Sequence, residues 1–207
     1  MVSRVKICGI TTLEDALFVA DCGADAIGLV FYGPSPRAVS VDQAATITAA
    51  LPPFVTTVAL FVNADPVQVE EVVDRVRIDQ LQFHGDESPE YCAQFSRPWM
   101  KAIRMRPEVD LLVEAERFAA SSALLVDAYQ SGIPGGTGAR FDWSRIPSTL
   151  HKPLVLAGGL SVENVAEGIE QLQPWAVDVS GGVEEAKGVK SHEKIIRFIE
   201  KVKQTQF

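Results

Sequence analysis

Cysteine is scarce in this 207-residue chain, which contains three. Cys8, Cys22 and Cys92 are an odd set at unrelated spacings, so they form neither a disulfide framework nor a zinc cluster. Free thiols are typical of a reducing compartment, and we therefore expect a cytoplasmic protein.

Long apolar runs and a surplus of basic residues are also lacking. No stretch approaches the roughly 20 apolar residues of a membrane span, and the N-terminus has no apolar signal-peptide core. The 19 Lys and Arg residues are outnumbered by 27 Asp and Glu residues, which gives a net charge of −8. Nucleic acids and anionic membranes attract basic surfaces, so we expect neither as a partner.

What the chain does contain is a regular alternation of short apolar runs and amphipathic stretches. The runs are rich in Val, Ile, Leu and Phe, and several are apolar throughout, as in a parallel sheet that is covered on both faces. Helix-capping signals open the stretches between them, for example Asp65 before Pro66 and Ser88 before Pro89. Eight strands are predicted, at residues 5–8, 26–31, 57–62, 80–84, 99–104, 123–127, 154–157 and 176–180.

Eight strand–helix units favour one architecture. Their mean length of about 26 residues is close to the minimum for a crossover unit, and eight of them match the small end of the (β/α)8 barrel range. An open, doubly wound sheet is the alternative, but it usually has five or six strands. We therefore predict an α/β fold, a single-domain (β/α)8 TIM barrel over residues 1–207.

Ionisable side chains gather toward the C-terminal ends of the predicted strands, where barrel enzymes carry their chemistry. Each of them alone has a structural interpretation, since a buried Cys is usually a core residue and a strand-end Asp often caps a helix. Several unused charges buried at one end of one barrel would be costly, so we predict a functional site there. The candidates are Cys8, His84, Asp127 and Asp178.

Two lysines interrupt the strands as well. By period-two alternation, Lys6 and Cys8 share one face of the first strand. We interpret Lys6, Lys101 and Asp178 as an internal ion-pair network, in which Lys6 can favour the thiolate form of Cys8.

Two glycine pairs predict an anion site. Gly158 and Gly159 follow the seventh strand, and Gly181 and Gly182 follow the eighth strand directly after Ser180. Converging backbone N–H groups and a helix N-terminus can bind an anion without Lys or Arg. Because these two loops are the usual phosphate site of this barrel type, we predict a phosphorylated ligand.

Two further loops contribute candidates. Arg37 lies on a proline-stiffened turn within residues 32–40, where its guanidinium either holds a carboxylate through two hydrogen bonds or is solvated. Residues 129–140 include four glycines and are long and flexible enough to fold over a ligand.

Several short motifs follow one another along essentially the whole chain. They lie at residues 5–11, 28–32 with 35–37, 82–85, 125–127, 135–138 with 141–143, 157–160 and 177–180. In this order the motifs resemble the phosphoribosylanthranilate isomerase family of tryptophan biosynthesis, and the opening Lys-Ile-Cys-Gly-Ile-Thr is highly specific. One departure is Gly181, since the family usually reads Asp-Val-Ser-Ser-Gly-Val-Glu there.

The resemblance implies an Amadori rearrangement. N-(5-phosphoribosyl)anthranilate, an aminoaldose, would become 1-(2-carboxyphenylamino)-1-deoxyribulose 5-phosphate, an aminoketose. It implies that Asp127 is the general acid, that Cys8 is the general base and that Arg37 holds the anthranilate carboxylate. His84 and Asp178 lie near the site by position.

The resemblance also bears on cofactors and partners. Neither a metal nor an organic cofactor is required, because the nitrogen of the substrate serves as the electron sink. The expected partner is a small phosphoribosyl substrate, and the chain is expected to be a monomer or a weak homodimer.

Two alternatives remain open from the sequence. The histidine-pathway aminoaldose isomerase performs the same rearrangement with two aspartates, so Cys8 argues against it. A catalytically silent phosphate-binding scaffold would need neither Cys8 nor Asp127.

Overall fold

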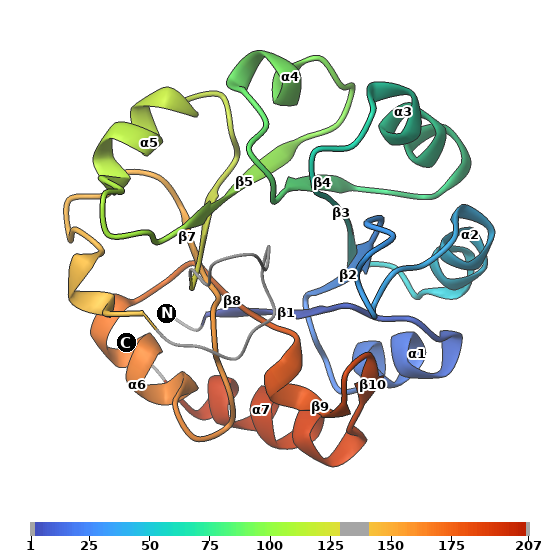
Figure 1. Ribbon diagram of the computed structural model, residues 1–207. Coiled ribbons are helices and arrows are strands. Elements are labelled where there is room, and N and C mark those ends of the chain that lie inside the picture. Colours follow the sequence, from blue (N-terminus) through green and yellow to red (C-terminus); the bar gives the residue numbers. More distant parts are fainter. Residues whose placement is uncertain (1–2, 129–140, 206–207) are drawn as a thin grey trace.

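Eight parallel strands close into a barrel in the computed structural model, which describes residues 3–128 and 141–205. Each strand pairs with the next along the chain, and the eighth closes the ring against the first. Figure 1 looks along the barrel and shows the helices around the strands. The predicted (β/α)8 barrel is confirmed, and the open sheet is wrong. The strands are β1 (Arg4–Cys8), β2 (Ala26–Val30), β3 (Thr56–Phe61), β4 (Gln80–Phe83), β5 (Trp99–Arg104), β6 (Leu124–Asp127), β7 (Leu154–Leu156) and β8 (Ala176–Val179).

The helices begin where the sequence offers capping side chains. The Asp65 side chain accepts a hydrogen bond from the backbone N–H of Val67, and Pro66 opens the helix because its first position needs no donor. No helix in the described part of the chain is long and apolar enough to cross a membrane. The α-helices of the described residues are α1 (Leu13–Asp21), α2 (Val41–Ala50), α3 (Pro66–Arg75), α4 (Pro89–Ala93), α5 (Leu111–Arg117), α6 (Val165–Leu172) and α7 (His192–Gln204).

Period-two alternation sorts the strand residues into two layers. On β5, Trp99 and Ile103 belong to the main core between strands and helices, whereas Met100 and Ala102 belong to a cluster inside the barrel. Cys8 belongs to a second interior cluster with two apolar residues of β2 and β3. A strand residue therefore reaches the interior only if its position has the right parity.

The described part of the connection after β6 differs from the predicted repeat. Its described part, residues 141–153, holds the short 3-10 helix η1 (Trp143–Arg145) instead of an α-helix. Pro147 follows η1 closely, and it lacks the backbone N–H that a continuing helix would need. Residues 129–140, which we expected to fold over a ligand, lie outside the described residues.

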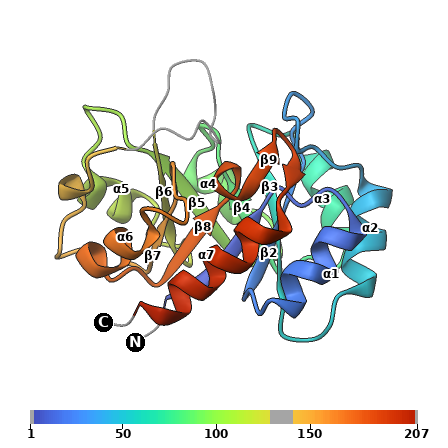
Figure 2. The same ribbon diagram turned by 90° about the horizontal axis from the view of Figure 1, so that it is seen from below.

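The connection after β8 contains a short hairpin that the sequence did not lead us to expect. A 3-10 helix, η2 (Gly181–Val183), leads into β9 (Glu184–Ala186), which pairs antiparallel with β10 (Val189–Lys190). Figure 2 shows the barrel from the side, with β9 beside the N-terminal part of α7. The hairpin buries Glu184 and Lys190, which are 7% and 5% exposed.

Candidate active site

Cys8 and Lys6 share one face of β1, as their alternation predicts, and the structure shows that this face points into the barrel. Cys8 is buried against Val30 and Leu60. A Cβ atom on Gly28, in the neighbouring strand β2, would lie 2.7 Å from Cys8 Sγ and 3.0 Å from Lys6 Nζ. The absence of a side chain at Gly28 therefore leaves the space in which the thiol and the ammonium group approach each other.

An ion pair joins the first and last strands. Lys6 Nζ lies 2.9 Å from Asp178 Oδ1, and the two side chains are 5% and 7% exposed. Burial acts to lower the pKa of Lys6, but the Asp178 carboxylate and the Cys8 thiol outweigh it and hold that pKa above its ordinary value. The predicted internal pairing of Lys6 with Asp178 is confirmed, and the ammonium group is charged at neutral pH.

The thiol of Cys8 is influenced by two lysines. Burial raises the pKa of Cys8 above its ordinary value, and the charges of Lys6 and Lys190 offset this rise only in part. The nearby Asp178 carboxylate adds to the rise. The thiol is thus mostly protonated at neutral pH, and formation of its thiolate depends on the surrounding cations.

His84 and Asp127 come together from β4 and β6. His84 Nε2 lies 3.0 Å from Asp127 Oδ2, and Gln82 Nε2 lies 3.0 Å from His84 Nδ1. When the Gln82 amide donates to Nδ1, the ring proton resides on Nε2 and is donated to the carboxylate. The backbone N–H of Ala128 donates to Asp127 Oδ1 at 2.8 Å, so both carboxylate oxygens accept hydrogen bonds.

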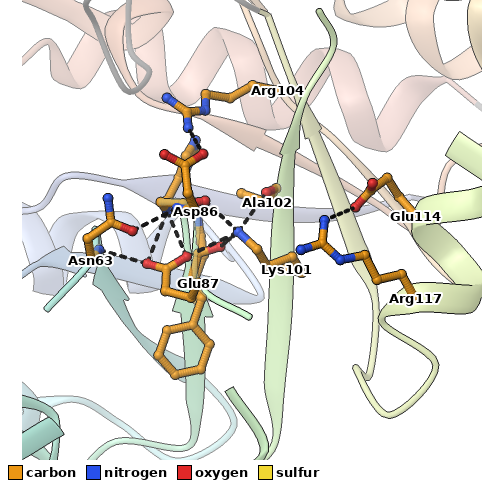
Figure 3. Close-up of polar contacts among 12 residues, drawn as sticks. Asn63, Asp86, Glu87, Lys101, Ala102, Arg104, Glu114 and Arg117 are labelled. Carbon is orange, nitrogen blue, oxygen red and sulfur yellow. Dashed lines mark hydrogen bonds and ion pairs between the residues drawn. The ribbon is translucent and has the colours of Figure 1, made fainter. Parts of the chain in front are cut away.

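Lys101 is not part of the barrel interior, and our interpretation of it was wrong. It shares the outward face of β5 with Trp99 and Ile103, and its Nζ lies 3.1 Å from Glu87 Oε2 outside the barrel wall. Figure 3 shows Lys101 and Glu87 facing each other, with Asn63 beside the Glu87 carboxylate. Both layers next to β5 are mainly apolar, so the sequence does not reveal which parity faces inward.

The glycine loops after β7 and β8 pack against each other. Gly158 and Gly159 have φ angles of 79° and 68°, which favour glycine. A Cβ atom on Gly182 would lie 1.9 Å from the carbonyl oxygen of Leu160, so only glycine permits this contact between the loops. A Cβ atom on Gly158 would lie 2.9 Å from Asp127 Oδ1, which places the first loop next to the carboxyl group.

Arg37 is buried rather than solvated. Its Nε and one terminal nitrogen donate to the two carboxylate oxygens of Glu184, each at 2.7 Å. Lys190 Nζ donates to the same carboxylate at 2.9 Å and to the Ser180 carbonyl at 3.2 Å. Two cations thus share one carboxylate, and the group keeps one net positive charge for an anionic ligand.

Glu184 and Lys190 were missed by sequence reasoning. Arg37 and Glu184 are 147 positions apart, and the short strands β9 and β10 have no apolar alternation. The signal that was available is the Glu that ends the motif after β8, where Glu184 follows Gly182 and Val183.

The sequence-predicted residues therefore share one end of the barrel. Cys8, Asp127 and Asp178 alternate with outward-facing apolar residues, and the glycine loops extend from the same strand ends. A thiol, a carboxyl group bound to an imidazole, and nearby cations can perform acid–base chemistry on a small anion. Among the described residues, no group of three or more His, Cys, Asp or Glu side chains could hold a metal ion.

Comparison with known proteins identifies one family. The family model for N-(5'phosphoribosyl)anthranilate (PRA) isomerase matches residues 5–201. An N-(5'-phosphoribosyl)anthranilate isomerase of Alcanivorax borkumensis is 57% identical, over 98% of this chain and 96% of that protein.

Solved structures agree with this match. The phosphoribosyl anthranilate isomerase of Thermotoga maritima has a TM-score of 0.88 at 40% identity, over 97% of this chain and 98% of that one. An isomerase structure in complex with reduced 1-(o-carboxyphenylamino)-1-deoxyribulose 5-phosphate has a TM-score of 0.86 at 40% identity, with the same coverage.

Proposed function

This chain belongs to the N-(5'-phosphoribosyl)anthranilate isomerase family of tryptophan biosynthesis, and we propose that it performs the isomerisation with Asp127 as general acid and Cys8 as general base. The substrate is N-(5-phosphoribosyl)anthranilate and the product is 1-(2-carboxyphenylamino)-1-deoxyribulose 5-phosphate. The observation that carries the proposal is that both residues reach the interior of the barrel at its C-terminal end.

Asp127 supplies the proton that opens the sugar ring. The proton passes to the furanose oxygen, the bond from that oxygen to C1′ breaks, and the nitrogen lone pair forms a C1′=N iminium. The donors His84 Nε2 and Ala128 N hold the carboxyl group in one orientation and stabilise the carboxylate that the proton leaves behind.

Cys8 removes the proton from C2′. The electrons of that C–H bond form a C1′=C2′ double bond, and the nitrogen regains its lone pair. The enolamine then gives its C2′ hydroxyl proton to the Asp127 carboxylate and takes up at C1′ the proton held by Cys8, which gives the ketone and restores both side chains. Protons and electrons balance over these steps. Because the nitrogen of the substrate accepts and returns the electron pair, the proposed reaction needs no cofactor.

Lys6 assists the base. Its ammonium group and the Cys8 thiol meet over Gly28, and its charge favours the thiolate in a site where burial disfavours it. Asp178 keeps Lys6 in place through the 2.9 Å ion pair.

The remaining residues hold the two anionic ends of the substrate. The loops at Gly158–Gly159 and Ser180–Gly182 bind the phosphate through backbone N–H groups. The contact between the two loops at Gly182 keeps the N–H groups of both loops next to each other. Arg37 binds the anthranilate carboxylate, and Glu184 fixes the orientation of its guanidinium. The reduced product bound to the related isomerase carries both anionic groups.

The test is the loss of anthranilate fluorescence when purified protein is mixed with phosphoribosylanthranilate. We expect the wild-type protein to convert the substrate. In Cys8→Ala and in Asp127→Asn we expect kcat to fall at least about 10²-fold, while folding and phosphate affinity are retained. Cys22→Ala is the matched control, because Cys22 lies at the end of α1 on the outside of the barrel. A near-normal kcat in either site variant would show that the role of that residue is wrong.

A further inference from the structure

Lys101 and Glu87 form a buried ion pair outside the barrel that the proposed chemistry does not use. Their side chains are 4% and 2% exposed, and Lys101 Nζ lies 3.1 Å from Glu87 Oε2. A buried pair of this kind contributes little net stability, because desolvation of both charges offsets their attraction. The main structural contribution of the two side chains is therefore their hydrogen bonds to the backbone, rather than the attraction between their charges.

These contacts converge on the two residues that flank His84. Lys101 Nζ donates to the carbonyl oxygen of Gly85 at 2.7 Å and to that of Phe83 at 3.3 Å. The Glu87 carboxylate accepts the backbone N–H of Gly85 at 2.9 Å. The peptide groups before and after His84 are thus both held by the pair.

Glu87 and its neighbour Asp86 also tie this loop to the adjacent elements. Glu87 Oε1 accepts the backbone N–H of Asn63 at 2.8 Å, and Asp86 contacts Arg104, the last residue of β5, at 2.5 Å. Figure 3 shows both contacts beside Lys101. Strand β4 ends at Phe83, and the last backbone bond to the sheet is the one that the His84 N–H donates to the Phe61 carbonyl of β3 at 2.8 Å. From Gly85 on, the side chains of Lys101 and Glu87 hold the backbone.

We propose that the Lys101–Glu87 pair is a positioning device for the reaction: it fixes the backbone at His84, and His84 in turn orients the Asp127 carboxyl group. The proposal rests on the proposed role of Asp127 as the acid. The path is continuous, from Lys101 Nζ to the carbonyls around His84 and from His84 Nε2 to Asp127 Oδ2 at 3.0 Å. A misplacement of about 1 Å at a reacting group can cost about 10²-fold in rate.

The test removes both charges together, so that neither is left buried alone. In Lys101→Met/Glu87→Gln we expect kcat to fall about 10- to 100-fold while KM stays within about two-fold. Lys152→Met is the matched control, because Lys152 Nζ also donates to two backbone carbonyls, those of Ala119 and Ser121, at 2.8 and 2.7 Å. These carbonyls lie in the segment before β6, and Lys152 itself lies before β7. This control variant should lower the melting temperature and leave kcat unchanged.

A double-mutant cycle separates positioning from general structural support. In a His84→Ala background the added Lys101→Met/Glu87→Gln change should have no further effect on kcat, since its route to Asp127 is already cut. An equally large fall in that background would overturn the proposal, and so would an unchanged kcat in the folded charge-free variant.

Imidazole NMR gives a readout that does not depend on turnover. The chain has three histidines, and we expect the ring nitrogen signals of His84 to shift in the charge-free variant while those of His151 and His192 stay. If the double variant does not fold, Glu87→Gln alone, which keeps the shape of the side chain, should shift the same His84 signals. Unshifted His84 signals would refute the positioning role.

The two proposals fail in different ways. If Asp127→Asn keeps its kcat, the acid assignment is wrong, while the His84 signals still test the positioning. If Asp127→Asn is inactive but the charge-free variant has normal kcat and normal His84 signals, only the positioning is wrong.

Discussion

Replacing Lys6 by Met probes the interior of the barrel in two ways at once. Met has a similar length but no charge, so Asp178 is left buried without its ion-pair partner. Breaking a buried pair by removing one member costs about 3–5 kcal/mol of unfolding free energy. Urea denaturation measures this loss, and Lys6→Met/Asp178→Asn should recover most of it because it removes both charges.

The same change acts on Cys8. The Lys6 ammonium and the Cys8 sulfur lie within 3.0 and 2.7 Å of one point above Gly28, and are therefore no more than about 6 Å apart. At an effective dielectric constant of about 20, unit charges at about 6 Å attract by about 3 kcal/mol, which favours the thiolate. Lys6→Met removes this attraction and leaves the repulsion of Asp178, so the pKa of Cys8 should rise further.

Iodoacetamide alkylation as a function of pH measures this effect. The assay needs a Cys22→Ala background, because Cys22 is partly exposed, whereas burial raises the pKa of Cys92 to about 12 and its side chain is inaccessible. We expect the alkylation midpoint of Cys8 to move to higher pH in Lys6→Met and to return part of the way in the double variant. An unchanged profile in the folded single variant would refute the role of Lys6.

Three further predictions follow from other contacts. Arg37→Ala should mainly raise KM for phosphoribosylanthranilate and change kcat little, because it removes a binding group; steady-state kinetics checks this. Gly182→Ala should weaken competitive inhibition by inorganic phosphate about 10-fold or more, since the new Cβ would meet the Leu160 carbonyl at 1.9 Å. Burial acts to raise the pKa of Glu184, but Arg37 and Lys190 outweigh it and hold this pKa below its ordinary value of about 4.3. The stability that the ionised carboxylate contributes is therefore present above that ordinary pKa and is lost as the pH falls through the lower pKa of the folded state. Glu184→Gln should flatten the acid limb of the denaturation profile, and an unchanged limb would contradict the assignment.

The architecture follows closely from apolar patterning. Each predicted strand lies within one residue of the observed strand at both ends, because a short apolar run flanked by polar residues marks the buried part of the chain. The helix starts at Pro66 and Pro89 follow from local capping chemistry. After β6, the described residues 141–153 hold only η1 where a helical unit was expected, since Pro147 cannot continue a helix.

The site was predictable only as far as parity and strand ends allow. The sequence places Cys8, His84 and Asp127 at one end of a barrel, and the structure adds that His84 contacts Asp127 across β5. The pairing of Arg37 with Glu184 depends on the β9–β10 hairpin, and its short strands have no apolar alternation from which it could be predicted. Lys101 shows the limit of alternation, since parity alone does not tell which face of a strand points inward.

The most direct measurement is a crystal structure with a reduced, unreactive analogue of the aminoketose product. We expect the Cys8 sulfur and the Asp127 carboxyl group to face each other across C1′ and C2′, with the phosphate on the backbone amides near Gly159 and Gly182. A ligand seated so that either side chain is out of reach of the reacting carbons, or a phosphate bound away from both glycine loops, would contradict it.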